Sequence, residues 1–224
     1  MAPKLILADL DGTLLDEEKH LTPRSRAALE RAAAAGAQVV IATGRFFGGV
    51  PDFLKELPFL RYFILMNGAK VYDRQTDTVL YRAEIPLDTA QAVYRLLDGL
   101  GCTVDCYQND RGMMPRTYLD HLEHYIPDPI VRMIIAPNRL PVDDLPAAMT
   151  QGGDTVQKMQ SFFPDLELRP QAMKLLAEQF PPAHPVHLPA HQPGAQRPRC
   201  HQGGRPGGPV PPSGAGPAGV RRLW

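Results

Sequence analysis

The sequence lacks the features that would mark a secreted, membrane-bound or nucleic-acid-binding protein. Only three of its 224 residues are cysteine, an odd number that gives no disulfide framework. Its 24 basic and 24 acidic residues cancel, so we expect neither a nucleic acid nor a membrane as partner. The first apolar run is too short for a signal peptide or a membrane span. We therefore expect a cytoplasmic protein, and nothing in the sequence sets its oligomeric state.

Acidic residues and lysine are also missing from the end of the chain. No Asp, Glu or Lys follows Glu178, whereas residues 181–224 hold 11 of the 24 prolines and eight of the 19 glycines. Such a composition propagates neither helix nor strand, so we expect a disordered Pro/Gly/Arg-rich tail. The abrupt change leads to the hypothesis that 181–224 is a reading-frame shift product; an unrelated tail is the alternative. Resequencing the gene distinguishes the two.

The pattern before residue 83 is that of a parallel α/β sheet. Residues 4–8 and 38–42 are short, nearly continuous apolar runs, as in strands buried on both faces. Between them, Thr22 and Pro23 are typical of a helix N-cap and first helical position, and Gly36 of a helix end. This is a β-α-β unit, and residues 62–66 predict a third strand.

The pattern of predicted helices and strands changes near Glu84. The spacing predicts helices over 86–100 and 143–149, and strands over 102–107 and 130–135. These elements alternate without glycine-rich phosphate turns, which favours a smaller α+β unit inserted into the first one.

Two carboxylates follow the first strand. Asp9 and Asp11 leave a buried strand for a turn at Gly12, so both can point into the crevice at the carboxyl end of the strand, where open α/β sheets bind ligands. Because close carboxylates repel, they need a cation, and oxygen ligands favour Mg²⁺. One carboxylate can attack phosphorus while the other transfers protons. The alternative is an Asp-rich surface turn.

The second strand ends in Thr43 and Gly44 at the same edge of the sheet. A hydroxyl and a free backbone N–H are the groups that a phosphate oxygen requires. One helix separates the two strands, which places their carboxyl ends side by side. This spacing favours a phosphate site over a surface turn.

These stretches resemble the motifs of one family. Residues 9–15 (DLDGTLL) resemble the first motif of the haloacid dehalogenase-like (HAD) superfamily, and residues 40–45 (VIATGR) resemble its second. Residues 62–69 (YFILMNGA) are similar to a strand end of the Cof-type members, subfamily IIB. The resemblance covers about 170 residues. It implies a HAD-like Rossmannoid core with a parallel sheet and an inserted α+β cap.

The resemblance also implies a chemistry. Asp9 would be the nucleophile and a Mg²⁺ ligand, Asp11 the general acid/base and a second ligand through its backbone carbonyl, and Thr43 with Gly44 would bind the phosphoryl group. The implied activity is Mg²⁺-dependent hydrolysis of small phosphate esters, such as sugar phosphates, through an aspartyl-phosphate. The partner would be a small phosphorylated metabolite.

The expected division has four parts. Residues 1–83 form the first part of the core, 84–160 the cap, 161–180 an incomplete return to the core, and 181–224 the tail.

The later part of the sequence departs from the family pattern. Family members carry a phosphate-binding lysine and an acidic Gly-Asp-x-x-Asn-Asp loop after the cap. Lys174 or Arg169 stands where the lysine is expected, and the acidic loop is absent. The alternative to an active phosphatase is therefore an impaired, vestigial protein that at most binds phosphorylated metabolites.

Overall fold

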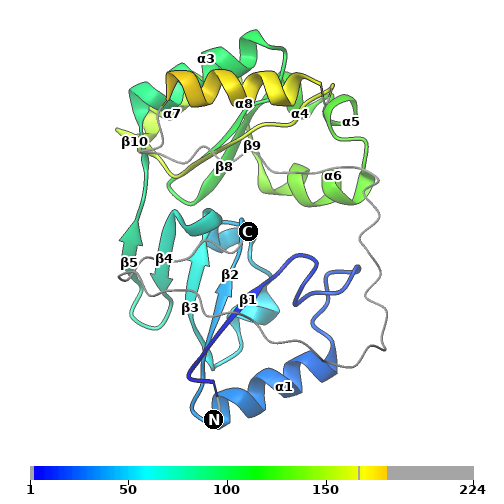
Figure 1. Cartoon of the computed structure of the whole chain (residues 1–224), viewed down its shortest axis with the longest axis vertical. Helices are drawn as coiled ribbons and strands as arrows, with labels where there is room; N and C mark the ends of the chain where they lie inside the picture. The colour runs from blue at the N-terminus through cyan, green and yellow to red at the C-terminus, as the bar shows by residue number, and fades with distance from the viewer. Residues whose placement is uncertain (1–2, 166, 181–224) are drawn as a thin grey trace, which may run out of the picture. The chain divides into compact units, whose positions relative to one another are not determined.

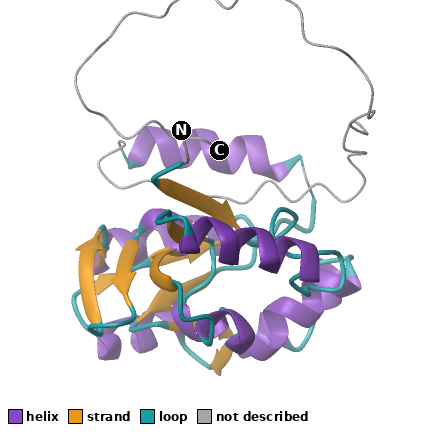
Figure 2. Cartoon of the chain, turned by 90° about the horizontal axis from the view of Figure 1, so that it is seen from below, coloured by secondary structure: helices purple, strands orange, loops and turns teal. Residues whose placement is uncertain are grey.

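Helices and strands alternate through residues 3–165 and 167–180, which the computed structural model describes (Figure 2). The described strands form a five-stranded sheet, a four-stranded sheet and a two-stranded ribbon. This confirms the expected α/β class. The tail at 181–224 lies outside the described residues, and its disorder stays a prediction.

The first sheet contains the predicted β-α-β unit. Its strands follow chain order; β1, β2 and β3 run parallel, and β4 and β5 add an antiparallel hairpin (Figure 1). The elements are β1 (Leu5–Asp9), α1 (Pro23–Ala34), β2 (Gln38–Ala42), η1 (Phe47–Gly49), α2 (Asp52–Lys55), β3 (Leu60–Leu65), η2 (Met66–Gly68), β4 (Lys70–Asp73) and β5 (Thr78–Arg82).

Helix α1 begins and ends where local chemistry predicts. Thr22 Oγ1 accepts a hydrogen bond from the backbone N–H of Ser25 at 3.2 Å, and Pro23 occupies the first helical position. Leu29 turns inward and is buried with the apolar residues of the strands. The helix therefore fixes the return of the chain to β2.

Strand β1 is less buried than its apolar sequence predicts. We expected burial on both faces, yet Leu5 and Leu7 are 54% and 58% exposed. Within the described residues β1 pairs only with β2, so it is an edge strand. An edge strand has one row of backbone N–H and C=O groups without a strand beside it.

The second sheet has the order β11-β7-β8-β9. The strand β7 is antiparallel to both neighbours, and β8 and β9 are parallel. The ribbon pairs β6 with β10. The elements are β6 (Ile85–Pro86), α3 (Leu87–Gly99), β7 (Asp105–Gln108), β8 (Arg111–Pro115), α4 (Arg116–Leu119), α5 (Leu122–Tyr125), α6 (Pro129–Ile135), η3 (Ala136–Asn138), β9 (Leu140–Val142), α7 (Leu145–Gly152), β10 (Thr155–Val156), β11 (Lys158–Gln160) and α8 (Leu168–Gln179).

Alternation along the strands gives the second sheet an apolar face and a polar face. The cross-strand neighbours Cys106, Met113 and Met159 lie in one buried cluster with residues of α3, α7 and α8. Tyr107 and Lys158 are also cross-strand neighbours, and they point the other way. Tyr107 packs with the apolar residues of the first sheet.

The last described segment packs differently from our expectation. We expected 161–180 to return to the core, but Ala172 and Leu176 of α8 are buried in the apolar cluster of the second sheet, alongside α3 and α7 (Figure 1). The sequence of residues 162–170 also predicts a strand, but helix α8 begins at Leu168, so this prediction is wrong. The apolar positions of α8 pack on the apolar face of the second sheet, and their burial there determines where the helix lies.

The expected strand at 130–135 is also wrong, because these residues belong to α6. Its β-branched residues favour a strand, but Asp128 caps the helix by accepting a hydrogen bond from the N–H of Ile130 at 2.8 Å. Pro129 then supplies the first helical position. None of the described helices has the length and apolar character needed to cross a bilayer.

Candidate active site

The candidate site lies where β1 and β2 end side by side. Asp9 is the last residue of β1 and is in register with Ala42, the last residue of β2, so Thr43 and Gly44 follow directly beside it. The carboxylate of Asp9 accepts a hydrogen bond from Thr13 Oγ1 at 3.4 Å. The structure thus brings the predicted nucleophile next to the predicted phosphate-binding loop.

The turn after β1 depends on glycine. Gly12 has a φ of 81°, in the left-handed region where a side chain is strained. The backbone N–H of Leu14 then donates to the carbonyl of Asp9 at 3.1 Å, and that of Leu15 to the carbonyl of Leu10 at 3.0 Å. These bonds hold the turn against the end of β1 and keep the backbone of Asp9 and Asp11 there.

The side chain of Asp11 is held by two cations. Arg45 donates from Nε to Oδ2 at 2.9 Å and from its terminal nitrogen to Oδ1 at 2.8 Å, and Lys19 Nζ lies 3.1 Å from Oδ1. Partial burial disfavours ionisation of Asp11, but Arg45 and Lys19 outweigh it and hold the pKa of Asp11 below its ordinary value. These two contacts therefore favour the ionised form of Asp11.

Thr43 and Gly44 form a tight loop with the end of β3. Thr43 is 2% exposed, and its hydroxyl oxygen accepts from the backbone N–H of Arg45 at 3.2 Å. The backbone N–H of Asn67 donates to the carbonyl of Thr43 at 3.1 Å. The hydroxyl hydrogen of Thr43 stays available to a ligand, since its oxygen is the acceptor in this contact.

Sequence reasoning gave no role to three residues at this site. Arg45 belongs to the quoted motif, and its partner Asp11 shows why an arginine follows Thr43 and Gly44. Nothing in the sequence around Lys19 indicates that it lies at this site. Lys158 comes from the second sheet and donates to the carbonyl of Gly44 at 3.1 Å, a contact that no sequence pattern indicates.

The residues proposed for the phosphate-binding lysine lie elsewhere. Lys174 is on α8, where its side chain is 76% exposed and its Nζ lies 3.9 Å from the carboxylate of Glu178. Arg169 lies on the same helix. Because α8 packs on the apolar face of the second sheet, neither residue joins the described contacts of Asp9, Asp11 or Gly44.

The donor chemistry at the end of β1 fits Mg²⁺ in part. Asp9 and Asp11 offer carboxylate and carbonyl oxygens, and Mg²⁺ is commonly held by one or two carboxylates together with water and substrate phosphate. Within residues 3–165 and 167–180, no three His, Cys, Asp or Glu side chains converge as a metal site. An ion here would depend on ligands beyond these side chains.

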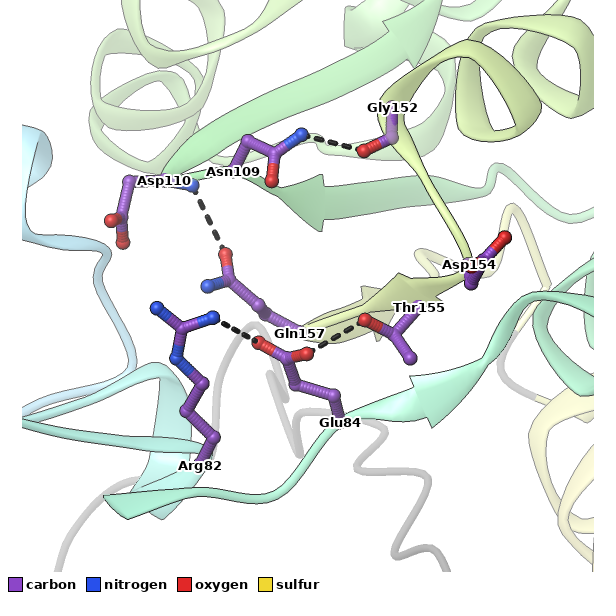
Figure 3. Close-up of a pocket in the computed structure, with 8 residues that line it drawn as sticks. All are labelled: Arg82, Glu84, Asn109, Asp110, Gly152, Asp154, Thr155 and Gln157. Carbon is purple, nitrogen blue, oxygen red and sulfur yellow. Dashed lines mark hydrogen bonds and ion pairs between the residues drawn. The ribbon is translucent and has the colours of Figure 1, made fainter. Parts of the chain in front are cut away.

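A polar cavity of about 220 Å³ lies apart from these residues (Figure 3). Around it, Thr155 Oγ1 donates to Glu84 at 2.6 Å, and the N–H of Asp110 donates to Gln157 at 3.0 Å. Its lining residues are Arg82, Glu84, Asn109, Asp110, Gly152, Asp154, Thr155 and Gln157. None of the four predicted site residues lines this cavity, so its volume says nothing about the strand-end site.

Known phosphatases are similar to part of this chain. The pyridoxal phosphate phosphatase YbhA of Escherichia coli is 38% identical over 98 residues, which are 44% of this chain and 36% of that protein. The 5-amino-6-(5-phospho-D-ribitylamino)uracil phosphatase YcsE of Bacillus subtilis is 34% identical over 76 residues, 34% of this chain and 30% of that protein. The chain thus matches about a third of the length of these relatives.

Solved structures share the fold over a longer stretch. A haloacid dehalogenase-like hydrolase from B. subtilis aligns with a TM-score of 0.63 at 19% identity, over 79% of this chain and 67% of that one. The subclass IIB sugar phosphatase BT4131 aligns with a TM-score of 0.58 at 20% identity, over 80% and 64%. A model of haloacid dehalogenase-like hydrolases matches residues 6–167, most of the chain and both sheets. By this match the chain belongs to the haloacid dehalogenase-like hydrolase family.

Proposed function

We propose that this chain hydrolyses small phosphate esters, with Asp9 as nucleophile and Mg²⁺ as cofactor. The observation that carries the proposal is the placement of Asp9 and Asp11 at the end of β1, beside Thr43 and Gly44. The relatives named as phosphatases of pyridoxal phosphate and of a phosphoribityl compound support a small phosphorylated substrate. Sugar phosphates belong to the same class.

The proposed reaction has two steps. A carboxylate oxygen of Asp9 attacks phosphorus and forms an O–P bond, the ester P–O bond breaks, and the leaving oxygen takes a proton from the acid form of Asp11. Water then attacks the phosphorus of the aspartyl-phosphate, and Asp11 accepts a proton from it. This step releases phosphate and restores the Asp9 carboxylate.

Other residues position the groups that react. The hydroxyl of Thr43 donates to a phosphoryl oxygen, and Arg45 and Lys19 keep Asp11 ionised for the second step. For the first step Asp11 must gain a proton, so these two ion pairs have to loosen when substrate binds. Bound Mg²⁺, held by Asp9 and the carbonyl of Asp11, would offset the negative charge of the phosphoryl group.

We also propose a revised division of the chain. Residues 84–160 were expected to form the cap, and the burial of α8 in the apolar cluster of the second sheet supports a cap that continues to residue 180. The core in the described residues then consists of the first sheet alone.

The test is phosphate release from a panel of sugar phosphates and pyridoxal phosphate, with and without Mg²⁺. Asp9→Asn should lower turnover by ~10³-fold or more, because no other group replaces the nucleophile. Asp52→Asn is the matched control, since Asp52 is 87% exposed on α2 and pairs with Lys55. Acid-quenched wild-type protein should carry a phosphoryl group on Asp9. Phosphate binding without turnover would instead indicate the vestigial protein.

A further inference from the structure

A lysine of the second sheet reaches the phosphate-binding loop of the first. Lys158 is only 9% exposed, and its Nζ donates to the carbonyl of Gly44 at 3.1 Å. A nearly buried ammonium is costly unless it serves a partner. Its described hydrogen bond uses one of three N–H donors, so two remain for a ligand at this loop.

The polar face of the second sheet holds this ammonium in place. Tyr107, its cross-strand neighbour, places its ring centre 4.8 Å from Lys158 Nζ. Asp105, two residues earlier on the same face, supplies negative charge, and Arg139 pairs with Asp105. Burial lowers the pKa of Lys158 to about 8, with Asp105 opposing the shift and Arg139 adding to it.

The loop is shaped to admit the lysine. A Cβ on Gly44 would lie 2.6 Å from Asn67 Oδ1 and 3.6 Å from Lys158 Nζ, so a larger residue would push Asn67 away. Asn67 Oδ1 is buried and has no hydrogen-bond partner among the described residues. Polar groups from the loop after β2, from η2 and from β11 thus converge beside Thr43, and they do not fully satisfy one another.

We propose that Lys158 binds the phosphoryl group of the substrate and supplies the positive charge that was expected from Lys174 or Arg169. The inference rests on the proposed phosphatase function. Lys158 donates a hydrogen bond to the Thr43–Gly44 loop, whereas Lys174 is exposed on α8 and pairs with Glu178. The second sheet would then contribute to phosphate binding as well as covering the site.

The test measures binding of inorganic phosphate to the full chain by calorimetry. Lys158→Met keeps the length and apolar stem but removes the charge, and it should weaken phosphate binding ~10–100-fold. Lys158→Arg should restore most of the affinity, and Lys174→Met, the control, should leave it unchanged. The KM for a hydrolysed ester should rise in parallel. Thermal melts of each variant establish that it is folded.

A pH series separates ligand binding from a merely structural role. Lys158 loses its charge as the pH rises through about 8, while arginine stays charged. The affinity of the wild type relative to Lys158→Arg should therefore fall over this range, and the ionisation of phosphate cancels in the ratio. The charged or titratable groups facing Lys158 are Asp105, Arg139 and Tyr107, and all three are common to both proteins.

The outcomes distinguish the two proposals. A folded Lys158→Met protein that binds phosphate as well as the wild type overturns the role of Lys158 and leaves the phosphatase proposal intact. A wild type that neither binds phosphate nor releases it from any ester overturns both.

Discussion

Two arginine–aspartate pairs, one in each sheet, shift the pKa of their carboxylates in opposite directions. In the first sheet, Arg61 donates to both oxygens of Asp73, at 2.6 to 3.0 Å, and the backbone N–H of Gln75 adds a bond at 2.9 Å. These hydrogen bonds, with that of Arg61 foremost, lower the pKa of Asp73 to about 2. In the second sheet, burial raises the pKa of Asp105 although Arg139 is bound to it.

The difference comes from solvent and from unsatisfied hydrogen bonding. In the first pair the side chain of Arg61 is 38% exposed and that of Asp73 is 4% exposed, so water still solvates the guanidinium. The side chains of Arg139 and Asp105 are 2% and 0% exposed. One oxygen of Asp105 also lacks a partner among the described residues. An ion pair lowers a carboxylate pKa only where its attraction exceeds the cost of desolvation.

The largest effect on stability is expected from removing the buried arginine, Arg139. Arg139→Met should lower the free energy of unfolding by about 3–5 kcal/mol, because the carboxylate of Asp105 would stay buried without its counter-charge. Urea denaturation near neutral pH measures the loss. Because the pKa of Asp105 is already raised in the folded state, the variant should regain stability as the pH falls and Asp105 takes up a proton.

Arg116→Met is the control for this prediction. Arg116 pairs with Asp143 at 3.1 Å, but the two side chains are 53% and 86% exposed, so its loss should cost less than about 1 kcal/mol. Equal losses in the two variants would contradict the argument from burial.

A pH series of stability sharpens the comparison further. The pKa of Asp73 is depressed, so its contribution to stability is present above the ordinary aspartate value of about 4 and is lost as the pH falls to about 2. Asp73→Asn should therefore be less stable than the wild type at neutral pH, and the two proteins should become equally stable under acid.

Asp105 has a raised pKa, so its contribution to stability has the opposite pH dependence and is lost as the pH rises. Thermal melts across this range should give differences of opposite slope for Asp73→Asn and Asp105→Asn; the same slope would refute the contrast.

The smallest effect concerns the edge of the first sheet. Leu7→Lys on β1 should change the free energy of unfolding by no more than about 0.5 kcal/mol, since Leu7 is 58% exposed. It should nevertheless reduce self-association, because a charged edge strand pairs poorly with another chain. Light scattering measures self-association. The control is Met133→Lys, which adds the same charge on the exposed side of helix α6, away from any sheet edge. Equal scattering from both variants would mean that net charge, and not the edge, controls association.

Much of the first sheet could be predicted because its signals are local. Thr22 and Pro23 start α1, Gly12 permits the turn after β1, and short apolar runs predict β2 and β3. The elements of the second sheet were harder to predict from the sequence. Residues 130–135 favour a strand by composition, but the cap provided by Asp128 decides for a helix.

The placement of α8 and the exposure of β1 could not be derived in this way. Both depend on which neighbour covers an apolar surface, and amphipathic patterns do not name that neighbour. The edge position of β1 follows from the pairing of the described strands, whereas its sequence is that of a central strand.

The sequence by itself determined the family and the α/β class, and it placed Asp9, Asp11, Thr43 and Gly44 after two neighbouring strands, because each lies within a short motif whose backbone chemistry is local. Only the tertiary structure decided which charged groups meet them. Arg45 lies 34 positions from Asp11, and Lys158 lies 114 positions from Gly44. Contacts over such separations depend on strand register and on the packing of one sheet against another, which no local pattern encodes.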